Sequence, residues 1–287
     1  MVGTFTKKRI IVEVFLKAKK FEDGNDSIKI DGLPTSVVIN KGGIPSQNEA
    51  SIIVEGLGME KMRSLVVVGF APLQLNRNRV KIYAGDTETP PLVFVGDQTE
   101  GVISIDDNGN ARLSIKAFTS VFAAQNPTPP VAVNGTAQAA ELCSQFAKEA
   151  GFSFENQGVT SSLSNCVISG DPVNKMINVS RQIGANLIID DQTVTLLPKD
   201  KPRKGPTDII SPETGLIGYP NVTARGVSCR CLFMPQLRFG QSVKVESVIP
   251  MASGTHRIIK INHTIEANKP DGGAWFTTFD SYFNYGL

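Results

Sequence analysis

The sequence has little of what would point to a particular enzyme class or compartment. Its 287 residues include 4 cysteines, 2 histidines and 1 tryptophan. No apolar run approaches the roughly 20 residues that a membrane-spanning helix needs. The polar segment Met1–Arg9 is followed by no apolar stretch long enough for a signal peptide. We therefore expect a soluble protein that folds in a reducing cytoplasm and has no stable membrane insertion.

An excess of charge of one sign is also missing. The chain carries 29 Lys and Arg residues against 27 Asp and Glu residues, which gives a formal net charge of +2. So even a balance produces no strong field toward nucleic acid or a membrane surface. The hydrophobic fraction of 41% is ordinary for a globular protein, so the chain can bury a sizeable core. Its length suggests about two domains, with three small ones as the alternative.

The four cysteines are too few for a disulfide scaffold at this length. Cys229 and Cys231 lie two apart on one face of an expected strand, Cys143 lies in an expected helix, and Cys166 lies in an expected strand. There is no Cys-x-x-Cys motif and there are only two histidines, so a zinc site is not expected. We interpret the cysteines as small buried hydrophobic side chains.

Motifs of catalysis are absent from the sequence. It contains no Gly-x-Ser-x-Gly elbow, no phosphate-binding loop and no dinucleotide fingerprint. His263 follows His256 by seven positions, and with this odd spacing a regular strand would point them to opposite faces. Trp275 is the only tryptophan, and core packing or a subunit contact suits it better than a sugar-binding platform.

A glycosidase needs two carboxylates placed across a cleft, and several acidic residues lie near the end of the chain. Glu246, Glu266, Asp271 and Asp280 are scattered over expected strands and loops, and nothing selects two of them. We therefore predict no catalytic, cofactor-binding or metal-binding residues and no hydrolytic activity. Cleavage of purified peptidoglycan that is lost on mutation of one acidic residue would contradict this prediction.

The first region, residues 1–122, is predicted to be a domain of short strands. Alternating or strongly apolar runs bounded by Gly, Pro and Asn indicate the strands, and one short helix is expected at Gly58–Leu65. The expected strands are Ile10–Leu16, Ile28–Ile30, Ser36–Asn40, Ala50–Gly56, Asn78–Ala84, Pro91–Gly96, Gly101–Asp106 and Ala111–Phe118.

The segment Asp106–Asn110 has two interpretations. Its carboxylates suggest a calcium loop, but an EF-hand also needs flanking helices and a carboxylate at its twelfth position. The expected neighbours are strands instead, and Asn108-Gly109 supplies the positive φ of a tight hairpin. We favour the hairpin, with Gly109 at positive φ.

The second region, residues 123–205, changes to a helical period and is predicted to be a small α/β domain. The proline-rich stretch Pro127–Pro130 is read as a linker. A helix capped by Thr136 is expected to end at Gly151, and a second one is expected over Pro172–Ile183 with Asp171 as its cap. Short strands follow each helix, and the last two form a hairpin over Asp190-Asp191-Gln192.

The basic stretch Lys199–Lys204 connects the second region to the third. It could contact phosphate, or it could be a solvated connection. Its four positive charges have no aromatic residues among them and are interrupted by Asp200. The solvated connection is the interpretation we favour for so short a run.

The third region, residues 206–287, carries the most specific pattern. It opens with Gly215-Leu216-Ile217-Gly218-Tyr219-Pro220 and continues with the strand-like run Gly226–Phe233. A Pro235–Gly240 turn precedes an alternating strand, and Gly272-Gly273-Ala274-Trp275-Phe276-Thr277 comes close to the end. Short alternating strands separated by Gly and Pro predict a small antiparallel barrel.

These motifs resemble the C-terminal tube-like domain of baseplate hub proteins from phages with contractile tails. The resemblance is densest over residues 215–278 and elsewhere is one of element order. It implies a mainly β fold in which two tube-like antiparallel barrels, 1–122 and 206–287, flank the small α/β domain. None of these motifs is catalytic; they describe a fold.

The family implies a structural role in the virion, with assembly in the host cytoplasm. Three chains with two barrels each would form a homotrimeric ring that joins a sixfold tail tube to a threefold central spike. Implied partners are the tail tube protein, the spike protein, other baseplate wedge proteins and the tape-measure protein, with genomic DNA only in transit. The alternatives are a tail-associated cell-wall hydrolase, which would need a cleft, and a receptor- or sugar-binding tail module.

Overall fold

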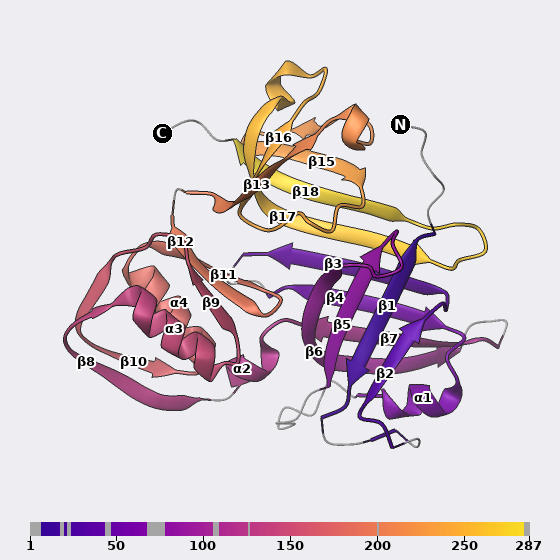
Figure 1. The fold of residues 1–287 in the computed structure, drawn as a ribbon, viewed down its shortest axis with the longest axis horizontal. Coiled ribbons are helices and arrows are strands. Elements are labelled where there is room, and N and C mark those ends of the chain that lie inside the picture. The colour runs from indigo at the N-terminus through magenta and orange to yellow at the C-terminus, as the bar shows by residue number, and fades with distance from the viewer. Residues whose placement is uncertain are drawn as a thin grey trace.

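Strands dominate the computed structural model, as the alternating pattern predicts (Figure 1). It describes residues 7–17, 20–21, 24–43, 47–67, 78–105, 109–125, 127–199 and 201–283. Within these ranges no helix is both long enough and apolar enough to cross a membrane. Buried apolar side chains form three clusters, one centred on each region of the chain, and the first also includes Ile265 and Ala267 of the third region.

The N-terminal strand group contains the elements predicted for the first region. Its sheet order is β3-β4-β7-β6-β5-β1-β2, and helix α1 (Met59–Ser64) lies beside it. The expected strands Pro91–Gly96 and Gly101–Asp106 are parts of one longer strand, β6. The strand bounds are β1 (Arg9–Phe15), β2 (Ser27–Asp31), β3 (Thr35–Gly42), β4 (Glu49–Glu55), β5 (Arg79–Gly85), β6 (Leu92–Ile105) and β7 (Ala111–Phe118).

The predicted hairpin between β6 and β7 is confirmed. The two strands pair antiparallel from Asp97↔Phe118 to Ile105↔Ala111. Gly109 has a φ of 81°, the left-handed conformation that a side chain disfavours. Asp106, Asp107 and Asn108 of the calcium alternative lie outside the described residues.

The C-terminal strand group follows the middle region. Two 3₁₀ turns, η1 (Pro212–Thr214) and η2 (Pro250–Ala252), interrupt its strands. β13 and β16 pair in parallel, whereas the other pairings of the group are antiparallel. The strand bounds are β13 (Arg203–Ile210), β14 (Asn221–Val222), β15 (Gly226–Leu232), β16 (Gln241–Val245), β17 (Gly254–Ala267) and β18 (Trp275–Phe283).

The prediction of two closed barrels is wrong, because the two strand groups share one open sheet. β3 and β17 pair antiparallel over eight residue pairs, from Thr35↔Ala267 to Gly42↔Lys260. The sheet path therefore runs β14-β15-β18-β17-β3-β4-β7-β6-β5-β1-β2, and no pairing among the described residues closes either group on itself. β3 and β17 pair the backbone hydrogen-bonding groups that each would otherwise leave free at the edge of its own strand group. Neither group therefore has to close into a barrel to protect that edge.

The middle module comprises residues 121–198 and has three layers (Figure 1). Helices α3 and α4 lie between the ribbon β8–β10 and the small sheet β11-β12-β9. Apolar side chains of both helices form the centre of its core. Its elements are α2 (Val121–Gln125), β8 (Thr128–Gln138), α3 (Ala139–Glu149), β9 (Ser153–Asn156), β10 (Ser162–Gly170), α4 (Pro172–Gln182), β11 (Ala185–Asp190) and β12 (Thr193–Pro198).

Of the two helix caps predicted for this module, one is present and one is not. The cap of α4 is confirmed, because the Asp171 side chain accepts a hydrogen bond of 2.9 Å from the Asn174 N–H. The cap predicted for α3 is wrong: Thr136 lies within β8, and α3 begins after Gln138. The prolines read as a linker stand at the start of β8, where pairing with β10 holds the chain extended.

Candidate functional site

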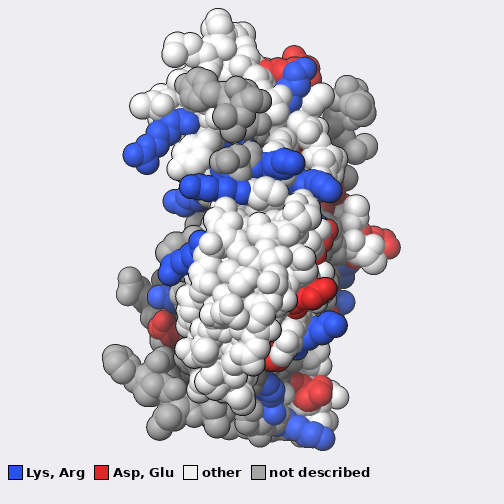
Figure 2. Space-filling view, turned by 90° about the vertical axis from the view of Figure 1, so that its left-hand side faces the viewer, with Lys and Arg blue, Asp and Glu red and all other residues white. Residues whose placement is uncertain are grey.

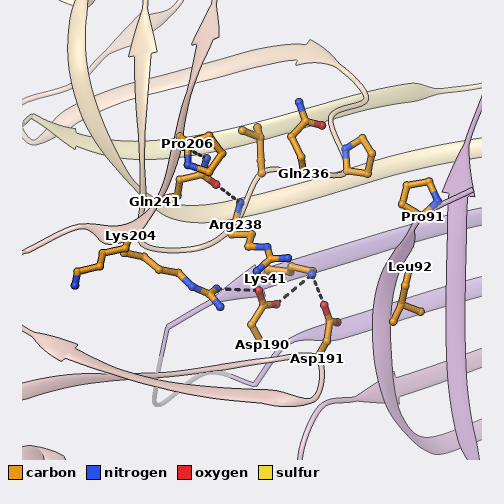
Figure 3. A pocket seen from close by; sticks show the side chains of 14 residues that line it. Lys41, Pro91, Leu92, Asp190, Asp191, Lys204, Pro206, Gln236, Arg238 and Gln241 are labelled. Atoms are coloured by element: carbon orange, nitrogen blue, oxygen red, sulfur yellow. Dashed lines mark hydrogen bonds and ion pairs between the residues drawn. The ribbon is translucent and has the colours of Figure 1, made fainter. Parts of the chain in front are cut away.

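A pocket of about 500 Å³ lies where the two strand groups and the middle module meet (Figure 3). Its lining comes from the end of β3, the start of β6, the β11–β12 turn, the start of β13 and the loop before β16. Because these segments are far apart in the sequence, only the tertiary fold brings them together. Buried charged side chains form one side of the pocket.

Lys41 is at the centre of this charged cluster. Its Nζ lies 3.1 Å from Oδ1 of Asp190 and 3.1 Å from Oδ2 of Asp191. Arg203 Nη1 lies 3.2 Å from the other carboxylate oxygen of Asp190. Lys41, Asp190 and Arg203 are each no more than 6% exposed. Figure 3 shows the two aspartates approaching Lys41 from the β11–β12 turn.

Local structure places each member of the cluster. On β3, Val37, Ile39 and Lys41 alternate toward the buried side, so the lysine is the last residue of an apolar row. Asp191 takes a left-handed φ of 53° in the tight turn, and its Oδ1 accepts a hydrogen bond of 3.0 Å from the Val95 N–H. The turn therefore contacts β3 and β6 at once.

The cluster sets the protonation of its members. Burial lowers the pKa of Lys41, but the carboxylates of Asp190 and Asp191 outweigh it and hold that pKa above its ordinary value. Burial raises the pKa of Asp190, yet Lys41 and Arg203 bring it below its ordinary value. The pKa of Asp191 is raised, by burial first and then by the repulsion of Asp190. Lys41 is therefore a fixed cation at neutral pH.

His263 lies near the cluster and stays neutral. Burial, and then the charge of Lys41, lower its pKa to about 3. Its Nδ1 lies 2.9 Å from the Thr277 hydroxyl, and its ring meets Phe233 edge-on with centroids 5.3 Å apart. A base with so low a pKa has little tendency to take a proton at neutral pH. The geometry is that of a joint between parts of the protein, in which buried opposite charges satisfy each other.

The expectation that the two histidines face opposite sides of their strand is wrong. Both are buried, at 3% exposure for His256 and 1% for His263. A register irregularity lies between Ile258 and Lys260, and the extra residue turns an odd spacing into a shared face. The histidines still have separate partners, because Nε2 of His256 lies 2.9 Å from the Ala252 carbonyl oxygen.

The four carboxylates considered earlier have separate surroundings, and none of them lines the pocket. Glu246 pairs with Lys244 at 2.7 Å, and Glu266 accepts hydrogen bonds from Ser36 and from the Ala274 N–H. Asp271 is exposed, and Asp280 lies opposite Lys260 in the sheet. In the described ranges, no group of three or more His, Cys, Asp or Glu residues is placed to hold a metal ion.

The remaining predicted residues are packed side chains. Trp275 is half-buried against the N-terminal core, with its ring 5.0 Å from that of Phe233. Cys143, Cys229 and Cys231 are buried free thiols, and burial raises the pKa of each to about 12. Cys166 is a half-buried free thiol in β10. The packing agrees with the interpretation of the cysteines as small hydrophobic residues.

None of the residues of the charged cluster is among the site residues predicted from the sequence. The expected strand Ser36–Asn40 ends one residue before Lys41. Asp190 and Asp191 were expected in a hairpin turn, and Arg203 in a basic connection. A lysine that continues an apolar alternation was the available signal, since such a position is expected to be buried and then needs a partner.

Comparison with known proteins identifies a family. The family model described as baseplate hub gp41 matches residues 11–271. No curated protein matches the sequence.

Solved structures show the same fold at low sequence identity. A tail protein from Neisseria meningitidis MC58 matches with a TM-score of 0.64 and 8% identity, over 96% of this chain and 97% of the other. The 43 kDa tail protein of prophage MuSo2 from Shewanella oneidensis matches with a TM-score of 0.62 and 10% identity, over 96% of both chains. The E. coli c3393 protein, described as a type VI secretion component similar to T4 tail proteins gp27 and gp5, matches with a TM-score of 0.55 and 9% identity, over 87% of this chain and 73% of that one.

Proposed function

Because this chain belongs to the baseplate hub gp41 family, we propose that it forms the trimeric ring that joins a sixfold tail tube to a threefold central spike. The family makes it a structural phage tail protein of the virion. In the proposal, residues 1–122 and 206–287 are two wall-forming domains, and residues 123–205 are a separate domain beside the wall. The ring would contact the tail tube protein, the central spike protein, the baseplate wedge proteins and the tape-measure protein.

The observation that carries the proposal is a continuous sheet wall across both strand groups. From β15 through β18, β17, β3, β4 and β7 to β6, each strand pairs with the next. One face of this wall is buried against the N-terminal and C-terminal cores, and the other is half-exposed and mostly polar. Two wall segments in each chain would turn threefold symmetry into approximate sixfold symmetry.

The charges on the open face of the wall balance. Arg112 pairs with Glu55 at 3.2 Å, and Lys116 pairs with Glu100 at 3.5 Å. Lys260 and Asp280 lie opposite each other on neighbouring strands. A surface with such local neutralisation would not hold phosphates, which suits a channel through which DNA passes. We therefore assign this face to the lumen of the ring.

The two ends of the wall offer a way to close the ring. Beyond Gly101, β6 pairs only with β7 among the described residues, and Ile105 is 67% exposed there. At the other end, Ile217 and Tyr219 expose apolar surface where the chain runs along β15. By analogy with the β3–β17 junction inside one chain, we propose that β6 of one copy meets the β14–β15 end of the next.

The experiment is mass photometry of the purified chain together with particle reconstruction. We expect trimers whose interfaces each bury more than about 1,000 Å², and three copies per baseplate. Ile105→Glu and Tyr219→Glu should each prevent trimerisation, whereas Val248→Glu, at an equally exposed loop position, should not. Six copies in the particle, or a position on a peripheral fibre, would overturn the proposal.

A further inference from the structure

A second groove lies between the middle module and the C-terminal strand group, and aliphatic and aromatic residues form part of its lining. It has a volume of about 320 Å³. Ile188 and Leu197 line it from the module but are almost fully buried, whereas Phe239 and Ile259 of the strand group are half-buried and offer apolar surface to it. Ile259 is the extra residue of the β17 irregularity, which explains why an aliphatic side chain points out of the core here.

One arginine lines this groove, and it holds the lysine-rich connecting segment beside it. Arg257 lines it and donates a hydrogen bond of 3.0 Å to the Lys199 carbonyl oxygen, so it fixes the connecting segment beside the groove. Lys199, Lys201 and Lys204 of that segment are all exposed. Arg203, by contrast, points inward and is used by Asp190. Figure 2 shows Lys and Arg gathered in a band above a broad uncharged surface.

The uncharged surface below the band corresponds to a stretch of sequence without charged residues. Strands β8 and β10 contain no Lys, Arg, Asp or Glu, and they pair with each other to form the outer ribbon of the middle module. The ribbon therefore adds no negative charge to oppose the band. The one acidic residue in the stretch 199–204 is Asp200, which leaves that stretch with a net positive charge.

We propose that this groove is a docking site for an acidic protein segment that carries apolar side chains, supplied by another tail protein. The apolar side chains enter the groove and lose contact with water, while the Glu or Asp residues between them face Arg257 and the neighbouring Lys199 and Lys201. Apolar burial supplies the affinity, and the charges on the rim set the orientation and the association rate.

The shape of the groove favours a peptide over nucleic acid. A phosphate backbone needs a track of cations and gains nothing from apolar side chains, and base stacking needs exposed aromatic faces in series. Two aromatic residues, Phe239 and Tyr282, line the groove, and two are too few for a series of stacked bases. Alternating acidic and apolar side chains match the charged rim and the apolar part of the lining at once.

The assignment of the partner to the tail rests on the proposed function, but the binding chemistry does not. The test therefore uses the purified full-length chain and a fluorescent synthetic peptide in which Glu alternates with Leu and Phe. Fluorescence anisotropy should show saturable binding that weakens as salt rises. A peptide with Ser at every apolar position, and a short DNA duplex, should bind much more weakly. Loss of trimer formation with intact peptide binding would reject the ring and keep the groove.

Matched variants locate the binding. Lys199→Glu/Lys201→Glu should weaken binding of the alternating peptide about tenfold, because two favourable charges become repulsive. Lys29→Glu/Lys61→Glu makes the same change in net charge at exposed positions of β2 and α1, and should leave binding unchanged. Ile259→Asn should weaken binding without changing its salt dependence. Equal binding by all variants, no binding at all, or tighter binding of DNA would each overturn the proposal.

Discussion

The molecule is held together by two joints of different kinds. The strand groups meet through backbone hydrogen bonds, eight residue pairs of β3 and β17 side by side. The middle module meets them through side chains, chiefly Asp190 and Asp191 of one turn around Lys41. Backbone pairing is available to almost any residue type, whereas a buried ion cluster needs each of its members. The wall should therefore tolerate substitutions that the module joint does not.

The largest expected effect is at the module joint. Lys41→Met removes the cation that Asp190 and Asp191 share and leaves buried carboxylates without their main partner. We expect a loss of roughly 3–5 kcal/mol in the free energy of unfolding, measured by chemical denaturation. Adding Asp191→Asn to Lys41→Met should restore part of the loss, since it removes one uncompensated charge.

A matched substitution at the wall joint provides the control. The Asn262 side chain bonds that of Asn40 at 2.7 Å across the β3–β17 junction, in a half-exposed position. Asn262→Ala should cost less than about 1.5 kcal/mol, because the backbone ladder remains. Equal losses for Lys41→Met and Asn262→Ala would remove the distinction between the two joints.

The sheet wall should lose stability when a side chain is added where two neighbouring strands lie too close together to hold it. A Cβ at Gly226 would lie 1.7 Å from the Ser281 carbonyl oxygen on the neighbouring strand β18. Gly226→Ala must push two paired backbones apart, and we expect a loss of roughly 3 kcal/mol. Thermal melting measures it. An unchanged melting temperature would mean that β15 and β18 are not this close.

Acid should weaken the wall joint through His263, which faces Ile39 across that joint. Its pKa falls from 6.5 in the unfolded chain to about 3 in the fold, so the unfolded chain binds more protons between these values. Its contribution to stability is present above pH 6.5 and is lost progressively as pH falls toward 3. Between pH 7 and pH 5 we expect a loss of roughly 2 kcal/mol in the free energy of unfolding.

His263→Gln isolates this contribution. Glutamine can keep a hydrogen bond to Thr277 and does not titrate, so its unfolding free energy should fall less over the same pH range. The raised pKa of Asp191 acts with the opposite sign but is present in both proteins, so it cancels in the difference. The same pH dependence in both proteins would show that His263 takes up no proton on unfolding.

The smallest expected effect is at a turn remote from both joints. Gly109 has a positive φ, and nothing lies within 4 Å of the Cβ that a substitution would add. Gly109→Val therefore meets only backbone strain, with a cost of roughly 1 kcal/mol or somewhat more. Thermal melting of Gly109→Val beside Gly226→Ala would separate strain in a turn from crowding in the wall, and an unchanged melt for Gly109→Val would count against the positive φ.

Much of the local structure could be read from the chain because its causes are local. Apolar alternation located most strands, Asn108-Gly109 indicated the β6–β7 hairpin, and Asp171 with Pro172 indicated the start of α4. The predicted cap of α3 at Thr136 was wrong because Thr136 pairs within the β8–β10 ribbon, which overrides its capping preference. The histidine faces were misread because a strand irregularity leaves no mark in the spacing of residues.

A mainly β protein with an α/β middle region, buried thiols and balanced charge can be inferred from the amino acids alone. These follow from composition and from periods of two and 3.6 residues, which act between near neighbours. Three features become visible only in the folded molecule: the sheet shared by the strand groups, the contact of Lys41 with Asp190 and Asp191, and the groove beside a basic segment. Each feature brings together residues that are far apart in the sequence or that belong to different elements. Their contacts depend on how whole strands and helices pack against one another.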